Sequence, residues 1–305
     1  MNDERGKEML GLYAYWNGSI IPIEDVKISP LDRGYQFGDG VYEVIRFYAG
    51  QLFETGRHLK RLQRSLNELF IPAPINMDEL EKTMHALIQQ ENLAQSDGMI
   101  YLQITRGAYP RSHGFPKGPA TPNMIMYAQT YPRPDIIEAG AKVILHPDLR
   151  WHRVDIKTLN LLGNVLAKQK AEEKGYHEAI LHRADVVTEA STANVFIVRK
   201  GVIWTHPANE AILNGITRLV VIDLIHSLGI PFVERPFTVD ALLTADEVFL
   251  TSTTLEVTPV TMIDDLILGE GIPGPLTRKL QEAFTRHMQA HSTSETRRAS
   301  EETHI

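Results

Sequence analysis

The 305-residue sequence contains no cysteine, which excludes a disulfide framework and any metal site built from thiolates. No apolar run approaches the roughly 18 residues of a membrane span, and the amino-terminal segment has mixed charge without an apolar core. The net charge of −7, without a basic cluster, argues against nucleic acid, because phosphate backbones attract concentrated lysine and arginine. These features predict a cytoplasmic protein with neither a membrane nor a nucleic-acid partner.

Several catalytic motifs are also missing from the sequence. A dinucleotide-binding G-x-G-x-x-G loop would begin at Gly38, but Glu43 stands where its last glycine belongs. His177 and His182 lack the helical spacing of metal ligands, and no H-E-x-x-H motif occurs. Ser191 lies in no G-x-S-x-G turn. The sequence therefore predicts no Rossmann cofactor site, no metal site and no serine hydrolase.

The patterns that are present indicate a two-domain α/β protein. Turn signals divide residues 13–56 into short predicted strands, and residues 41–48 alternate between apolar and polar side chains as a half-buried strand does. Apolar residues three and four positions apart predict amphipathic helices at 57–70 and 77–93. Pro132 and Pro134 stiffen a connector. We expect four segments: a small amino-terminal α/β domain (1–131), a connector (132–135), a larger α/β domain (136–290) and a disordered tail (291–305).

Two residues carry most of the chemical information, Lys157 in RVDIKTLNLLGN and Glu189 in VVTEASTANVF. A lysine among apolar neighbours can act as a desolvated amine that attacks an aldehyde. A carboxylate fixed on a strand can keep a heterocyclic nitrogen protonated. Taken singly, a lysine is most often a solvated surface group, and an acidic residue among threonines is often solvent-facing. The pairing of the two therefore matters more than either residue alone.

With their flanking residues, these two segments resemble the fold-type IV (class IV) aminotransferases that depend on pyridoxal 5'-phosphate (PLP). The family includes branched-chain aminotransferases, D-amino-acid aminotransferases and aminodeoxychorismate lyase. The similarity extends from about Tyr13 to about Met288 and is greatest to the D-amino-acid aminotransferases. It implies a two-domain α/β (α+β) fold with mixed and antiparallel sheets flanked by helices, PLP as the cofactor, and a homodimer.

The resemblance also implies roles for individual residues. Lys157 would form the Schiff base with PLP and shuttle the catalytic proton, and Glu189 would contact the pyridine nitrogen. Ile216 and Thr217 open a predicted helix, whose free N–H groups attract anions in any family. Leu213 could equally be a core residue, and Arg61 a helix-surface charge. The implied cofactor-binding residues are Lys157, Glu189, Arg61, Leu213, Ile216, Thr217 and Thr253.

Substrate recognition is predicted at Arg111 and His113, which resemble the R-x-H element that binds the substrate α-carboxylate in D-amino-acid aminotransferases. A tyrosine matching Tyr42 completes that element, and the family's loop reaches into the neighbouring subunit's pocket. Without the resemblance, Arg111 and His113 would be interpreted as surface charges. The predicted reaction transfers an amino group from a D-amino acid such as D-alanine to a 2-oxo acid such as 2-oxoglutarate, by a ping-pong route. The alternatives are a branched-chain L-amino-acid aminotransferase, an R-selective amine transaminase, an aminodeoxychorismate lyase and a catalytically silent PLP-holding protein.

Overall fold

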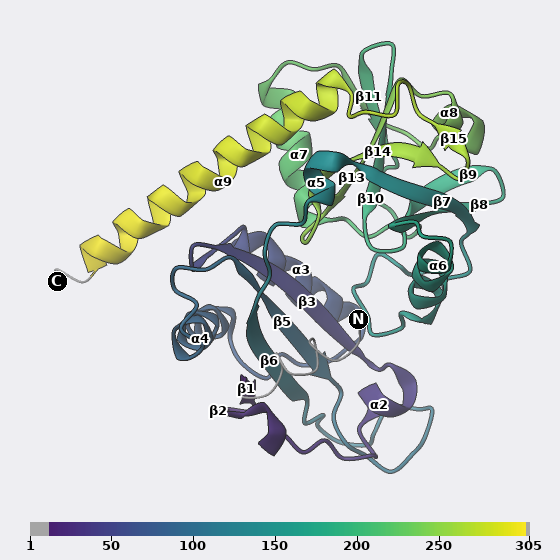
Figure 1. The fold of residues 1–305 in the computed structure, drawn as a ribbon. Coiled ribbons are helices and arrows are strands. Elements are labelled where there is room, and N and C mark those ends of the chain that lie inside the picture. The colour runs from purple at the N-terminus through teal and green to yellow at the C-terminus, as the bar shows by residue number, and fades with distance from the viewer. Residues whose placement is uncertain (1–11, 303–305) are drawn as a thin grey trace. The chain divides into compact units, whose positions relative to one another are not determined.

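The computed structural model describes the backbone of residues 12–302 and the side chains of residues 12–291 (Figure 1). The chain divides into two compact units. Unit 1 comprises the described residues of Met1–Pro132, Ile156–Asn160 and His291–Ile305, and unit 2 comprises Arg133–Asp155 and Leu161–Ala290. The short segment that contains Lys157 therefore belongs to unit 1. The sequence had predicted it in the larger carboxy-terminal domain.

Unit 1 is built on an antiparallel six-stranded sheet in the order β2-β1-β6-β5-β3-β4. Asn17 and Gly18 both have positive φ, which gives the tight turn that joins the first two strands. The strands are β1 (Tyr13–Trp16), β2 (Ser19–Pro22), β3 (Gly40–Tyr48), β4 (Gln51–Leu52), β5 (Gly98–Thr105) and β6 (Asn123–Thr130). The helices are η1 (Ile23–Asp25), α2 (Arg33–Phe37), α3 (Thr55–Glu68) and α4 (Met77–Gln90).

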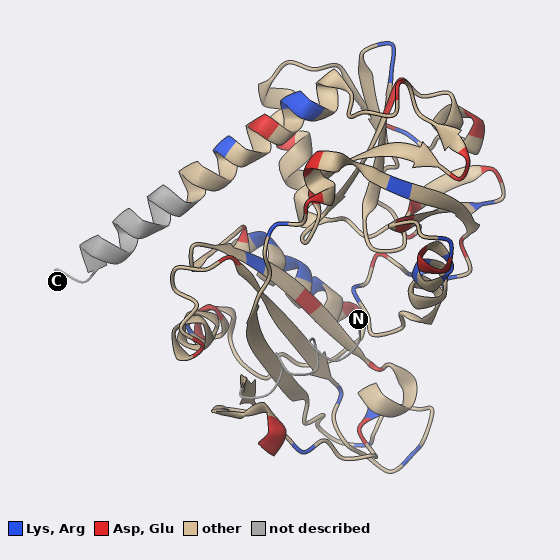
Figure 2. Cartoon of the chain, viewed as in Figure 1, with Lys and Arg blue, Asp and Glu red and all other residues tan. Residues whose placement is uncertain are grey.

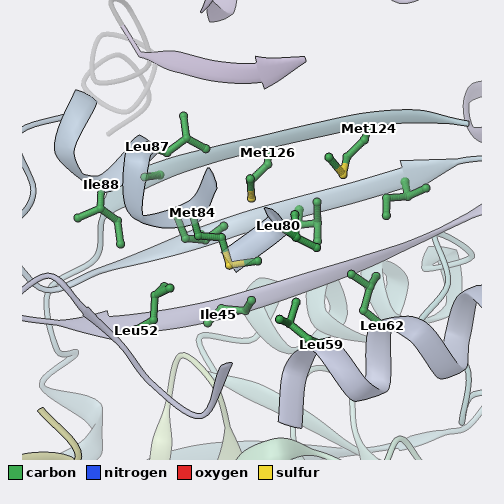
Figure 3. Packing of buried hydrophobic residues seen from close by; sticks show 14 of the residues in the cluster. Ile45, Leu52, Leu59, Leu62, Leu80, Met84, Leu87, Ile88, Met124 and Met126 are labelled. Atoms are coloured by element: carbon green, nitrogen blue, oxygen red, sulfur yellow. The ribbon is translucent and has the colours of Figure 1, made fainter. Parts of the chain in front are cut away.

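Helices α3 and α4 bury one apolar stripe each against this sheet, as the three- and four-residue spacing predicts. Asn76 caps α4 by accepting a hydrogen bond from the Glu79 N–H. Figure 3 shows the packed side chains that these elements contribute, namely Leu59 and Leu62 of α3, Leu80, Met84, Leu87 and Ile88 of α4, and Ile45, Met124 and Met126 of the sheet. Alternation along β3 places Tyr42 and Glu43 on opposite faces of that sheet.

Unit 2 is built on a mixed sheet in the order β12-β11-β10-β13-β14-β7-β8-β9, with β15 paired to β14. The pairs β11/β12, β14/β7 and β7/β8 are parallel and the others antiparallel. The strands are β7 (Ala141–Pro147), β8 (Glu178–Arg183), β9 (Val186–Ala190), β10 (Asn194–Arg199), β11 (Val202–Thr205), β12 (Phe232–Glu234), β13 (Glu247–Ser252), β14 (Glu256–Ile263) and β15 (Leu266–Ile267). The helices are α5 (Ile136–Ala139), α6 (Leu162–Glu173), α7 (Ile216–Ser227), α8 (Val239–Leu243) and α9 (Pro275–Glu302).

The predicted α/β class with antiparallel and mixed sheets is confirmed. The carboxy-terminal segment differs from expectation, because α9 continues to Glu302 where we expected a disordered tail from residue 291. Low apolar content suggested disorder, but the alanine, glutamate and arginine in that segment are strong helix formers. No helix within the described residues has both the length and the apolar character needed to cross a membrane.

Candidate active site

Lys157 lies in a short irregular segment whose backbone is held on two sides in unit 1. Its carbonyl accepts a hydrogen bond from the Tyr42 N–H at 3.0 Å, and its own N–H donates to Ser65 Oγ at 3.3 Å. The next residue, Thr158, forms a β-bridge with Val41 of β3. The half-buried Lys157 side chain places Nζ 4.2 Å from the centroid of the Tyr42 ring. The Lys157 amine therefore contacts the Tyr42 ring. Its backbone is held by two hydrogen bonds and by the neighbouring β-bridge.

Arg61 is buried in unit 1 and forms a two-point ion pair with Glu43. Its Nε and Nη2 donate to the two carboxylate oxygens at 2.7 and 2.8 Å, and His58 Nδ1 lies 2.9 Å from Glu43 Oε2. Burial would raise the pKa of Glu43, but the charge and hydrogen bonds of Arg61 hold it well below its ordinary value. Figure 2 shows basic residues gathered along α3 beside an acidic position on β3. Arg61 is thus a buried cation and not the helix-surface charge that its spacing alone would suggest.

Arg111 and His113 lie on the exposed loop between β5 and β6. Both contact Phe37, because the Arg111 guanidinium lies 5.0 Å from the ring centroid and the His113 ring centroid lies 5.5 Å away. Among the described residues, no hydrogen bond or ring contact joins Tyr42 to either of them. One chain therefore gathers the two loop residues but does not complete the predicted three-residue set.

Glu189 is buried on β9 of unit 2, with three hydrogen bonds to its carboxylate. Arg150 Nη1 donates to Oε1, while Asn194 Nδ2 at 2.9 Å and the Leu213 N–H at 3.0 Å donate to Oε2. Burial raises the pKa of the Glu189 carboxyl, and the nearby Arg150 guanidinium opposes that rise. An ionised carboxylate accepts about four hydrogen bonds, and the described residues donate three to Glu189, so among them one acceptor position is left for a further donor.

Arg150 was missed by the sequence analysis. It donates through Nε and Nη2 to the two oxygens of Asp148, both at 2.9 Å, and through Nη1 to Glu189. Asp148 thus fixes the guanidinium, and the guanidinium in turn fixes the Glu189 carboxylate. The run DLRWHR gave no signal of this role, because the contact joins residues 39 positions apart.

The start of α7 lies next to the same carboxylate. Asn194 Nδ2 bridges Glu189 Oε2 and the Leu213 carbonyl, so the residues just before the helix are tied to Glu189. A Cβ added to Gly215 would lie 2.2 Å from Asn194 Oδ1, so only glycine permits this close approach. No side chain within the described part of the chain caps the helix, so the first-turn N–H groups, including those of Ile216 and Thr217, can bind an anion.

Thr253 follows β13, which packs against α7. Two residues earlier, Thr251 pairs in register with Asn194. Thr253 therefore lies in the turn just beyond the strand position that faces Asn194. Unit 2 brings together Glu189, Leu213 and the start of α7, with Thr253 on the adjoining strand end.

Each unit, considered by itself, offers groups that suit PLP by their chemistry. Glu189 offers an open acceptor position for a protonated ring nitrogen, and the uncapped start of α7 offers N–H groups for a phosphate. Lys157 offers a primary amine held on a fixed backbone. No group of three or more potential metal ligands occurs among the described residues.

Comparison with known proteins matches the family model "Amino-transferase class IV" over residues 40–263. The D-alanine aminotransferase of Staphylococcus epidermidis (strain RP62A) is 46% identical over 277 residues, which cover 90% of this chain and 98% of that protein. The D-alanine aminotransferase of Staphylococcus aureus (strain MSSA476) is 44% identical over 279 residues, covering 91% and 98%.

Solved branched-chain amino acid aminotransferases share the fold. The Escherichia coli enzyme has a TM-score of 0.85 at 29% identity, covering 90% of this chain and 94% of that one. The enzyme of Thermobaculum terrenum, solved in its PLP form, has a TM-score of 0.81 at 27% identity, covering 93% and 95%. The chain therefore belongs to the class IV aminotransferases, a family of PLP-dependent transaminases.

Proposed function

We propose that this protein is a D-amino-acid aminotransferase that moves the amino group of a D-alanine-like donor to a 2-oxoglutarate-like acceptor by a ping-pong route. The observation that carries the proposal is the exposed pair Arg111 and His113 on one loop, a set of donors suited to a single α-carboxylate. The curated relatives at 44–46% identity are D-alanine aminotransferases. The branched-chain enzymes, at 27–29% identity, are the weaker alternative.

Each proposed residue has a separate task. Bound PLP would supply an electron sink for the charge left when the substrate α-proton departs. The Lys157 amine would hold the cofactor and would then carry the proton released from the substrate α-carbon. The Glu189 carboxylate, which is fixed by Arg150, would keep a proton on the ring nitrogen. Arg61, Ile216, Thr217 and Thr253 would contact the phosphate, and Leu213 the ring.

Handedness follows from the position of the base. A single lysine removes only the α-hydrogen that points toward it, so the positions of carboxylate and side chain decide which enantiomer reacts. A loop that binds the carboxylate through Arg111 and His113 fixes one of these positions. Because Arg111 and His113 resemble the carboxylate-binding element of D-amino-acid aminotransferases, we favour D-amino acids over the L-amino acids of branched-chain enzymes.

We further propose a homodimer in which the loop of one subunit brings Arg111 and His113 to Tyr42 of the other. The lack of contact between Tyr42 and that loop within the described part of one chain supports this arrangement. Leu162, Val165 and Leu166 also lie on one face of α6 and are 77%, 55% and 62% exposed, which suits burial against a partner. We place the enzyme in the cytoplasm, where PLP and 2-oxo acids are metabolites.

The proposed reaction is tested by its first half alone. Holoenzyme mixed with D-alanine is expected to convert fully to the pyridoxamine form, with loss of the visible absorbance, while L-alanine leaves the spectrum unchanged. Conversion by L-alanine or L-leucine would support a branched-chain enzyme, and conversion by an R-amine that lacks a carboxylate would support an amine transaminase. A protein that binds PLP but reacts with none of these would be an aminodeoxychorismate lyase or a silent holder, and release of pyruvate from aminodeoxychorismate would distinguish the two.

The role of Arg111 is tested by replacing it with alanine. Loss of hydrogen bonds to a charged group is expected to raise the KM for D-alanine roughly 10- to 100-fold. Retention of PLP and thermal stability should not change, because Arg111 is exposed. Lys117→Ala, which removes an exposed charge from the same loop, is the control. If PLP retention fell as much as substrate affinity, the loop would be structural instead.

A further inference from the structure

The loop that carries Arg111 and His113 has no regular structure of its own. Residues 106–122 form neither helix nor strand, apart from one β-bridge between Ala108 and Asp32. The side chains from 110 to 115 are exposed. A loop of this kind is ordinarily mobile, whereas binding a carboxylate through two side chains needs a fixed backbone.

A buried arginine holds the backbone of this loop. Arg33 is the first residue of α2, and its side chain is 5% exposed. Its Nη1 donates to the carbonyls of Ser112 at 2.5 Å and Gly114 at 3.3 Å, and its Nη2 donates to the carbonyl of His113 at 3.4 Å. One guanidinium thus contacts three consecutive carbonyls, two within the R-x-H element and one directly after it.

Asp39 fixes the orientation of this guanidinium. Its Oδ2 accepts from Arg33 Nε at 2.7 Å and from Arg106 Nε at 2.8 Å, and its Oδ1 accepts from Arg106 Nη2 at 3.0 Å. Burial would raise the pKa of Asp39, but the hydrogen bonds and charges of both arginines hold it below its ordinary value, so the carboxylate stays ionised. Arg106 also lies 3.9 Å from the ring of Phe115, farther along the loop.

Phe37 couples the buried and exposed parts of this arrangement. The Arg33 guanidinium lies 4.8 Å from its ring centroid, and the Arg111 guanidinium lies 5.0 Å from the same centroid. The His113 ring packs against it as well. Helix α2 therefore contacts both the backbone and the side chains of the R-x-H element, through Arg33 and Phe37.

We propose that Arg33, oriented by Asp39, is the positioning residue that sets the Ser112–Gly114 backbone and so aims Arg111 and His113 at the substrate carboxylate. This inference rests on the proposed function. Arg33 does not touch substrate, and its effect reaches catalysis only through the loop. Its loss should weaken the recognition of carboxylates more than it affects the cofactor or the chemical step.

The test compares Arg33→Met with the wild-type holoenzyme and with Arg64→Met, which removes an exposed guanidinium from α3. Asp39 keeps Arg106 as a partner in the variant, so the fold should persist. We expect the KM for D-alanine and the inhibition constant of propionate to rise roughly tenfold or more. PLP retention should be unchanged, and turnover at saturation should stay within about threefold. Amide hydrogen exchange of residues 111–118 should accelerate.

Arg33→Lys provides a second variant in case methionine prevents folding. It keeps a cation beside Asp39 but lacks the planar fork that contacts three carbonyls, so it should reproduce the loss of carboxylate affinity. The inference is overturned if both variants keep wild-type values for D-alanine and propionate, or if PLP retention, turnover and KM worsen together. If the wild-type enzyme does not react with D-alanine, the proposed function is overturned, and with it this role for Arg33. This holds whatever the amide hydrogen exchange of residues 111–118 shows.

Discussion

Lys157→Ala is expected to lower transamination by about 10⁴-fold or more, because one substitution removes both the covalent amine and the proton carrier. The purified variant should also lose the visible absorbance of lysine-bound PLP. Its fold should persist, since the contacts of Lys157 with Tyr42 and Ser65 run through the main chain. The Nζ contact with the Tyr42 ring contributes only about 0.5–1 kcal/mol.

Two comparisons make this result specific. Lys60→Ala removes an exposed lysine from α3 and should keep both absorbance and turnover. Adding a small primary amine to Lys157→Ala should restore part of the proton transfer, because the missing base is then supplied from solution. Wild-type colour and turnover in Lys157→Ala would show that another group performs both tasks.

Glu189→Gln is expected to reduce turnover by about 10²- to 10³-fold, the usual cost of removing a charge that stabilises a transition state. An amide cannot keep the ring nitrogen protonated, although it fills the same space. Loss of the ion pair with Arg150 should also lower the free energy of unfolding. The decrease should be limited to about 1–3 kcal/mol, because Arg150 keeps Asp148 as a partner. Turnover under saturating PLP and chemical denaturation measure the two effects separately.

Glu256→Gln is the matched control for the stability effect. Glu256 is buried in unit 2 and pairs with Arg133 at 2.8 Å, outside the proposed cofactor contacts. Its replacement should destabilise the fold without lowering turnover. Equal loss of turnover in both glutamine variants would mean that Glu189 acts through stability and not through the cofactor.

Local patterns in the sequence predicted the elements that position the site. The spacing of apolar residues indicated α3 and α4, and alternation indicated the strand that carries Tyr42. The helix that was predicted to open at Ile216 is α7. These features depend on neighbours within a few residues, so they can be predicted from the sequence.

The contacts that the sequence could not predict join distant residues. The bridge between Thr158 and Val41 places Lys157 in unit 1, and Arg33 reaches carbonyls about 80 positions away. Periodicity reveals which face a residue occupies but not which partner it meets. The arginines at 33 and 150 therefore had no local signal, although each fixes a residue that the sequence did single out.

The most direct test of this account identifies the lysine that holds the cofactor. Holoenzyme is reduced with borohydride, which makes the link to PLP permanent, and the digested protein is mapped by mass spectrometry. The phosphopyridoxyl group should be found on the peptide that contains Lys157 and on no other. Its recovery on a different lysine, or on none, would contradict the central claim.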